Sequence, residues 1–180
     1  MGGILFGTTP EVVKKVRTEA YNVYPQEEVP LHYEQLEFLK YADAVAQEAM
    51  RLKPTTPQMY MESKTDVVIN NLSLPKGTNI ILQNKVPQTQ EHYFSNANTF
   101  SPERWLVNAC PMHENHSPNV MRVFGGGPRF CPGMFLAKSE MVVLISVLCK
   151  HFDFSLQSDV TDIKERFDFT MYPRKFESNF

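Results

Sequence analysis

The chain has 180 residues, of which 42% are hydrophobic and 12% aromatic, so it holds enough apolar material for a core of ordinary size. This composition excludes an intrinsically disordered chain. Eighteen Lys and Arg stand against 20 Asp and Glu, giving a formal net charge of -2, and no run of like charge is dense enough to bind a phosphate backbone. A nucleic acid is therefore not expected as a partner.

Cysteine usage and hydropathy predict a cytoplasmic chain. Cys110, Cys131 and Cys149 are too few and too scattered for a disulfide framework or a zinc cluster, which favours a reducing compartment. The residues before Pro10 lack the basic and then apolar order of a signal peptide. The most apolar stretch, residues 141–149, is shorter than the ~20 residues of a membrane-spanning helix. No membrane segment is expected in this chain, and an anchor upstream of it stays open.

Two amphipathic helices are predicted in the first third of the chain. The first begins at Pro10, because Thr9 suits the N-cap and proline suits the first helical position. The second runs from Leu36 to Leu52, where apolar residues recur three and four positions apart, and Pro54 ends it.

The centre of the chain changes to short strand-like runs. Residues 67–69, 72–74 and 79–82 are apolar and are separated by turn-forming asparagine, proline and glycine, which predicts a small β-sheet. Residues 87–122 are mostly polar and rich in proline, which predicts a long loop.

The last third is predicted to hold a buried helix and an edge hairpin. The helix covers residues 133–152 and is apolar on nearly every face between residues 141 and 148, as buried helices are. The tail, residues 155–180, alternates weakly between apolar and polar residues, which favours a hairpin. These elements together predict a mainly α fold with small β-sheets, of the α+β class.

The candidate site is the segment 124–133, which reads Phe-Gly-Gly-Gly-Pro-Arg-Phe-Cys-Pro-Gly. Its glycines permit positive φ and close approach of the backbone to a flat ligand. Cys131 stands directly before the predicted helix, whose positive N-terminal end stabilises a thiolate. Arg129 is placed to pair with a carboxylate on the same ligand. Since an isolated cysteine is ordinarily a small buried hydrophobe, the prediction depends on the pattern around it.

That pattern carries a family resemblance. Phe124, Gly127, Arg129, Cys131 and Gly133 reproduce, at every spacing, the Phe-x-x-Gly-x-Arg-x-Cys-x-Gly haem-binding signature, and the chain thereby resembles the C-terminal portion of the cytochrome P450 family. The resemblance implies haem b, iron protoporphyrin IX, as the cofactor and Cys131 as the axial ligand of its iron. It also implies that Arg129 binds a haem propionate, Phe124 packs near the sulfur, and the glycines let the backbone approach.

Two weaker motifs follow the order of the same family. Glu48-Ala-Met-Arg51 lies in the second predicted helix, and Pro-Glu-Arg104-Trp precedes the cysteine segment. The resemblance implies a buried ion network of Glu48, Arg51 and Arg104 that holds the Cys131 loop against the second helix. Its role would be structural, and removing one partner of such a network should cost about 3–5 kcal/mol.

The resemblance implies a haem-thiolate monooxygenase, in which the thiolate donates electron density through the iron and one oxygen atom of O₂ enters an organic substrate. It further implies an apolar small-molecule substrate and an electron-donating reductase or ferredoxin. Residues 1–180 would then form a single partial domain, the haem-binding portion with the Glu-x-x-Arg helix, the cysteine loop and the following buried helix.

Two departures from the family pattern leave alternatives open. The oxygen-activating threonine of the family is expected on a long helix before Pro10; Thr8 and Thr9 are interpreted as cap residues, and no catalytic residue is predicted. Met61 stands where many members carry an arginine for a haem propionate. The alternatives are a haem-binding or interaction remnant without turnover, and a peroxygenase or isomerase that does without the threonine. With the covering helices of the family outside this chain, the apolar helix is expected to make it marginally stable or sticky.

Overall fold

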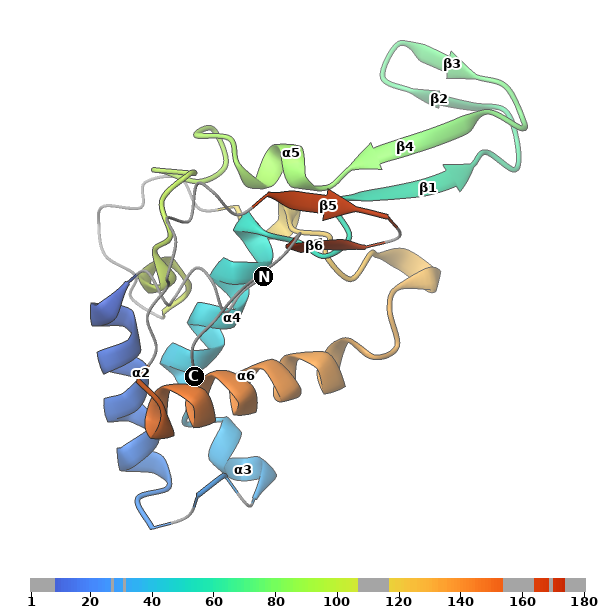
Figure 1. The fold of residues 1–180 in the computed structure, drawn as a ribbon. Coiled ribbons are helices and arrows are strands. Elements are labelled where there is room, and N and C mark those ends of the chain that lie inside the picture. The colour runs from blue at the N-terminus through green and yellow to red at the C-terminus, as the bar shows by residue number, and fades with distance from the viewer. Residues whose placement is uncertain are drawn as a thin grey trace.

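The computed structural model describes residues 9–26, 28–30, 32–106, 117–153, 164–168 and 170–173. Its body is formed by the helices α2, α4 and α6, and in the described part the strands pair two by two into separate antiparallel sheets, as Figure 1 shows. The α+β class predicted from the sequence is confirmed. The long helices are α2 (Pro10–Val23), α4 (Lys40–Leu52) and α6 (Met134–His151).

The core lies where α2, α4 and α6 cross. Val12, Val16 and Ala20 of α2 are buried against α4 and α6, so the apolar stripe of the first predicted helix faces the core. Each fully buried side chain of this size contributes about 1.5–3 kcal/mol. Cys149 of α6 is also fully buried there, and burial raises the pKa of its thiol to about 11. Cys149 is therefore a packing residue and not a nucleophile.

The second predicted helix is two helices, so the prediction was wrong about its beginning. A single turn, α3 (Tyr33–Leu36), is followed by a break, and Leu39 is the buried N-cap residue of α4. The carboxylate of Glu19 on α2 accepts the backbone N–H groups of Tyr41 at 2.7 Å and Ala42 at 2.9 Å, which satisfies the first turn of α4. The apolar spacing continues across this break, and therefore the sequence pattern did not reveal it.

The central strands form two two-stranded sheets instead of the one sheet predicted. The three predicted runs are present, and a further strand, Gln58–Glu62, precedes them with a mixed sequence that gave no strand signal. Figure 1 shows the paired strands projecting from the helical body as an arm. The pairs are β1 (Gln58–Glu62) with β4 (Asn79–Gln83), and β2 (Val67–Ile69) with β3 (Leu72–Leu74).

The predicted loop holds short helical turns, two of which begin with a proline. Residues 107–116, which include Cys110, lie outside the described residues. The turns η1 (Pro102–Trp105) and η2 (Pro118–Val120) lie within the predicted loop, whereas α5 (Lys85–Gln88) overlaps its beginning and η3 (Gly127–Arg129) follows it. The tail contains the predicted hairpin, which is formed by β5 (Glu165–Phe167) and β6 (Met171–Pro173).

Helix α6 is buried on one side only. Val142, Ile145, Ser146 and Cys149 pack toward α2 and α4. Among the described residues nothing covers the other large side chains of α6, in line with the expectation that the covering helices of the family lie outside this chain. The exposed large side chains of the helix are Phe135 (68%), Leu136 (65%) and Leu144 (58%).

Candidate functional site

Glu48, Arg51 and Arg104 meet in a buried ion network. Arg51 donates from Nε to Glu48 Oε2 at 2.9 Å and from Nη2 to Oε1 at 2.8 Å. Arg104 of η1 donates from Nε to Glu48 Oε1 at 3.1 Å, although 56 residues separate the two. Burial alone would raise the pKa of Glu48, but the hydrogen bonds and charge of Arg51, the Ser101 N–H and the charge of Arg104 hold it below its usual value.

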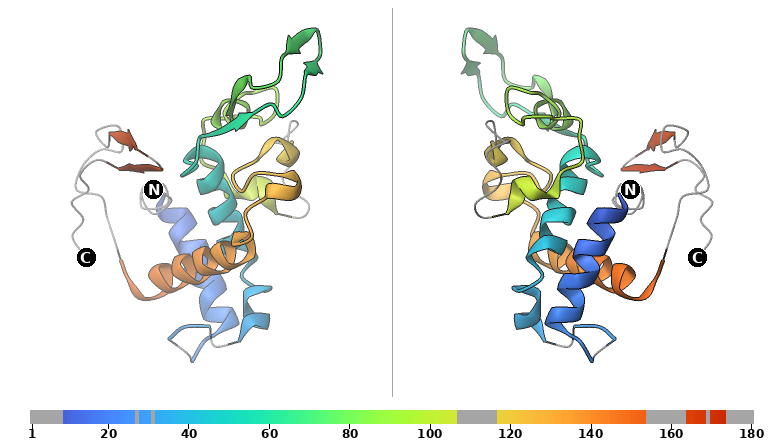
Figure 2. Two further views of the ribbon diagram at one scale, coloured as in Figure 1. Left: turned by 90° about the vertical axis from the view of Figure 1, so that its right-hand side faces the viewer. Right: turned by 90° about the vertical axis from the view of Figure 1, so that its left-hand side faces the viewer.

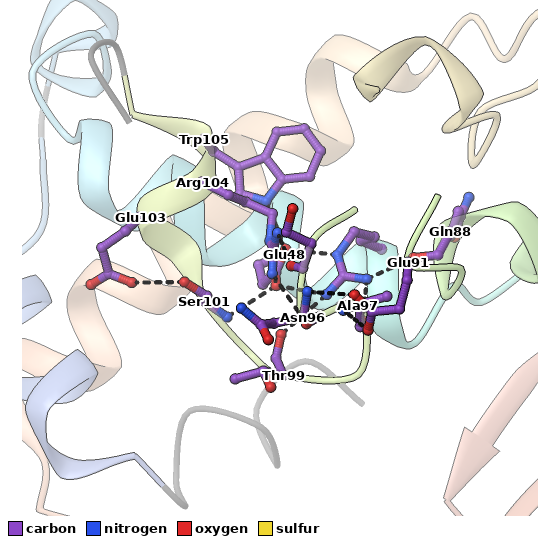
Figure 3. A network of polar contacts seen from close by, with 12 residues as sticks. Glu48, Gln88, Glu91, Asn96, Ala97, Thr99, Ser101, Glu103, Arg104 and Trp105 are labelled. Carbon is purple, nitrogen blue, oxygen red and sulfur yellow. Dashed lines mark hydrogen bonds and ion pairs between the residues drawn. The ribbon is translucent and has the colours of Figure 1, made fainter. Parts of the chain in front are cut away.

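The network also holds the backbone of residues 88–99 against α4. Arg51 Nη1 donates to the carbonyl oxygens of Gln88 and Ala97, each at 2.6 Å, and Nη2 donates to that of Thr99 at 3.2 Å. Arg104 Nη1 donates to the carbonyl of Ser95 at 3.0 Å. Figure 3 shows Glu48 and Arg104 side by side, next to the loop that carries Asn96, Ala97 and Thr99. Backbone carbonyls of this kind occur at every residue, and therefore no sequence signal identified these partners.

Glu48 binds two further donors that the sequence did not predict. The indole N–H of Trp105 donates to Glu48 Oε2 at 2.8 Å, and the backbone N–H of Ser101 donates to Oε1 at 3.0 Å. With two arginines, the carboxylate thus has four donor groups, as a charge that is fully buried requires.

The ion network and the cysteine loop border a common cavity. Trp105 and Phe124 line the same cavity of about 230 Å³, together with Met50 of α4 and Met134 of α6. The hydrogen bonds of Glu48 described above come from α4 and from residues 101–105. Trp105, which binds Glu48, thus borders the same cavity as Phe124 of the Cys131 loop, and the expectation that the network holds this loop against α4 stays a prediction.

The cysteine loop is a tight turn closed at its base. The backbone N–H of Cys131 donates to the carbonyl of Phe124 at 2.8 Å, and that of Gly125 donates to the carbonyl of Arg122 at 2.9 Å. Gly125 and Gly127 have φ of 77° and 66°, the left-handed region that glycine adopts without strain. These two positions explain why the segment is rich in glycine.

Cys131 presents an exposed thiol at the entrance to α6. Its carbonyl accepts the N–H of Met134, the first residue of α6, and Gly133 is the N-cap. A Cβ built at Gly133 would lie 3.8 Å from Cys131 Sγ, so Gly133 leaves the space beside the sulfur open. The thiol therefore lies close to the unpaired N–H groups and the positive end of an 18-residue helix.

The surroundings of the thiol fit a haem group. Arg129 is exposed, and Phe130, Phe135 and Leu136 offer exposed apolar surface on either side of Cys131. In the part of the chain that the structure describes, no three His, Cys, Asp or Glu side chains gather to bind a metal ion. A single thiolate donor suits a metal whose remaining ligands belong to a porphyrin. Met61, at the position of the family's arginine, is exposed on β1 and cannot pair with a carboxylate.

Strand β1 lies against the cysteine loop. A Cβ built at Gly125 would meet the terminal methyl of Met59 at 3.5 Å, which is ordinary van der Waals contact. The segment after Pro57 is thus close to the candidate site.

Comparison with known proteins identifies the family. The family model described as Cytochrome P450 matches residues 4–180, nearly the whole chain. A crystal structure of a cytochrome P450, CYP102L1, superposes with a TM-score of 0.80 at 25% identity, over 93% of this chain and 38% of that one. The chain belongs to the cytochrome P450 family.

Curated relatives come from animals and plants. "Cytochrome P450 12b1, mitochondrial" of Drosophila acanthoptera is 28% identical over 177 residues, which are 94% of this chain and 31% of that protein. "Cytochrome P450 3A17" of Cavia porcellus is 32% identical over 82% of this chain and 28% of its own length. "Tabersonine 16-hydroxylase 2" of Catharanthus roseus is 31% identical over 89% of this chain and 31% of its own length. The chain thus spans about a third of the curated relatives it matches. Among the described residues, no helix combines the length and the hydropathy needed to cross a bilayer.

Proposed function

We propose that this chain supplies the haem-binding part of a haem-thiolate monooxygenase, with Cys131 as the axial ligand of the iron. The observation that carries the proposal is the exposed thiol of Cys131 at the end of a glycine turn and directly before α6, in a chain of the cytochrome P450 family. Haem b, when bound, supplies the iron chemistry that inserts one oxygen atom of O₂ into an organic substrate.

The residues of the chain hold and orient that group. Cys131 provides the anionic sulfur, and the N-terminal end of α6 favours its charge. Arg129 binds a propionate, because a guanidinium pairs well with a carboxylate. Gly127 and Gly133 allow close approach, and Phe124 packs at the base of the loop, where its carbonyl already accepts the Cys131 N–H. Glu48, Arg51 and Arg104 act structurally by fixing residues 88–105 on α4.

The partners follow from the same proposal. We infer an apolar organic substrate and an electron-donating reductase or ferredoxin. One relative is named as a hydroxylase. Because another is named as mitochondrial, the cytoplasmic location expected from the sequence requires its own test by cell fractionation. We further propose that residues 1–180 act as one partial domain.

Spectroscopy of Cys131→Ala tests the ligand. The chain is loaded with haem, reduced and exposed to CO; thiolate ligation gives a strongly red-shifted Soret band. The band should disappear in Cys131→Ala and persist in Cys149→Ala, the matched control, since Cys149 is buried in the core. A spectrum of nitrogen-ligated haem, or loss of the band in both variants, would contradict the assignment. Reductase-driven hydroxylation by the haem-loaded protein then tests turnover itself.

A further inference from the structure

The β5–β6 hairpin is joined to the rest of the protein by the side chain of Glu165. One carboxylate oxygen of Glu165 accepts a hydrogen bond from Lys53 Nζ, and the other accepts one from Lys85 Nζ at 3.2 Å. Lys53 is the C-cap residue of α4, and Lys85 is the first residue of α5. One carboxylate therefore joins three elements that lie up to 112 residues apart in the chain.

Among the described residues, few other interactions hold the hairpin in position. Its two strands have three residues each and, in the described part, pair only with one another, so they form a two-stranded hairpin of marginal intrinsic stability. Figure 2 shows it at one side of the molecule, away from the crossing of the core helices. One backbone hydrogen bond reaches the body: the N–H of Met171 donates to the carbonyl of Thr55 at 2.7 Å, between α4 and β1.

The hairpin forms one wall of a largely apolar cleft. Phe167 and Met171 face Val86 of α5 and Pro57 across a cavity of about 410 Å³. Lys85 also lines this cleft, and thus the ion pair with Glu165 lies at its edge. The distance between the hairpin and α5 consequently sets the width of the cleft.

We propose that Glu165 is a positioning residue that fixes the β5–β6 hairpin against α4 and α5 and thereby sets the width of this cleft. Two ammonium groups from separate elements share one carboxylate, so breaking either pair leaves the hairpin with fewer contacts to the body. The side chains of Lys53 and Lys85 are about one-third exposed, and salt therefore weakens both pairs. Met59 of β1, next to the cleft, also lies near Gly125 of the Cys131 loop.

Hydrogen exchange of the Met171 amide tests the proposal in the 180-residue chain without haem. Glu165→Gln should accelerate exchange of this amide about fivefold, because the hairpin opens more often. Asp168→Asn is the matched control: Asp168 lies on the same hairpin and pairs within it, with Arg166 and Tyr172, so its loss should leave Met171 exchange unchanged. The Ser63 amide, bonded to the Thr78 carbonyl, should not respond to either variant.

Ionic strength and charge reversal supply two further outcomes. Added salt should accelerate Met171 exchange in the wild type and not in Glu165→Gln. Glu165→Lys should open the hairpin, and adding Lys53→Glu and Lys85→Glu should restore slow exchange. The proposal is overturned if Glu165→Gln exchanges like the wild type, if Asp168→Asn has an equal effect, or if charge reversal restores nothing. Since none of these measurements needs haem, failure of the Cys131 spectrum leaves their outcome unaffected.

Discussion

At the scale of single residues, the most consequential group is the carboxylate of Glu48. It is fully buried and accepts hydrogen bonds from Arg51, Arg104, Trp105 and the Ser101 backbone. A buried ion pair contributes little compared with an apolar replacement, but removal of one partner leaves uncompensated charge. The two arginines would then be buried together without their anion.

The variant Glu48→Gln should therefore lower the free energy of unfolding by about 3–5 kcal/mol. Glu103→Gln is the matched control, because the partly exposed Glu103 accepts hydrogen bonds from Lys15 at 2.6 Å and Tyr41 at 2.7 Å. Its loss should cost about 1 kcal/mol or less. Urea unfolding followed by circular dichroism measures the free energy of unfolding of both variants. An equal loss in the two would show that burial of the Glu48 network does not make its contribution to stability larger.

At the scale of elements, α6 has two different long sides. Its inner side packs Val142, Ile145 and Cys149 into the core, and its outer side exposes Leu136 and Leu144. Apolar surface of this kind favours self-association. The exposed side fits the sequence-based expectation that this chain is sticky, and that expectation stays a prediction until it is measured.

Leu144→Gln should reduce self-association of the chain and change the free energy of unfolding by no more than about 0.5 kcal/mol, since Leu144 is a surface residue. Ile145→Gln, one position along the helix, should instead destabilise the fold by about 2–5 kcal/mol, because it empties and polarises a buried site. Light scattering together with urea unfolding separates the two effects. Unchanged scattering in Leu144→Gln would show that another surface drives association.

At the scale of the whole molecule, carboxylates govern the response to acid. The pKa values of Glu48, Glu103 and Glu165 are lowered, that of Glu103 to about 2, because the cations and hydrogen bonds around them outweigh burial. Burial raises the pKa of Glu19, which accepts backbone N–H groups at the start of α4. Glu48, Glu103 and Glu165 therefore favour folding in their ionised form. Of the four carboxyls, Glu19 alone favours folding in its protonated form.

The free energy of unfolding should consequently fall as the pH drops. A carboxyl with a lowered folded pKa contributes its full stabilisation above its unfolded value of about 4.5, and the contribution disappears as the pH falls through the folded value. Glu19 opposes this trend in part. Urea midpoints at pH 7 and at pH 3 measure the effect, and Glu48→Gln should flatten the dependence. A midpoint that rises in acid would indicate that Glu19 dominates.

The sequence by itself determined the candidate site and the family. Cys131, the proposed ligand, and its glycines lie between Phe124 and Gly133, directly before α6, so local spacing contains the whole pattern. The helices α2 and α6, three of the strands and the tail hairpin were also predictable, because periodicity and turn residues act over a few positions.

Only the tertiary structure decided which groups meet across long separations. The second predicted helix is interrupted before Leu39, and Glu19 of another helix accepts a backbone N–H at the start of α4. The tertiary structure also joined Glu165 to Lys53 and Lys85, and it left one side of α6 exposed. The physical reason is that capping, ion pairing and solvent exposure depend on which distant segment lies nearby, whereas apolar spacing along one segment does not record its neighbours.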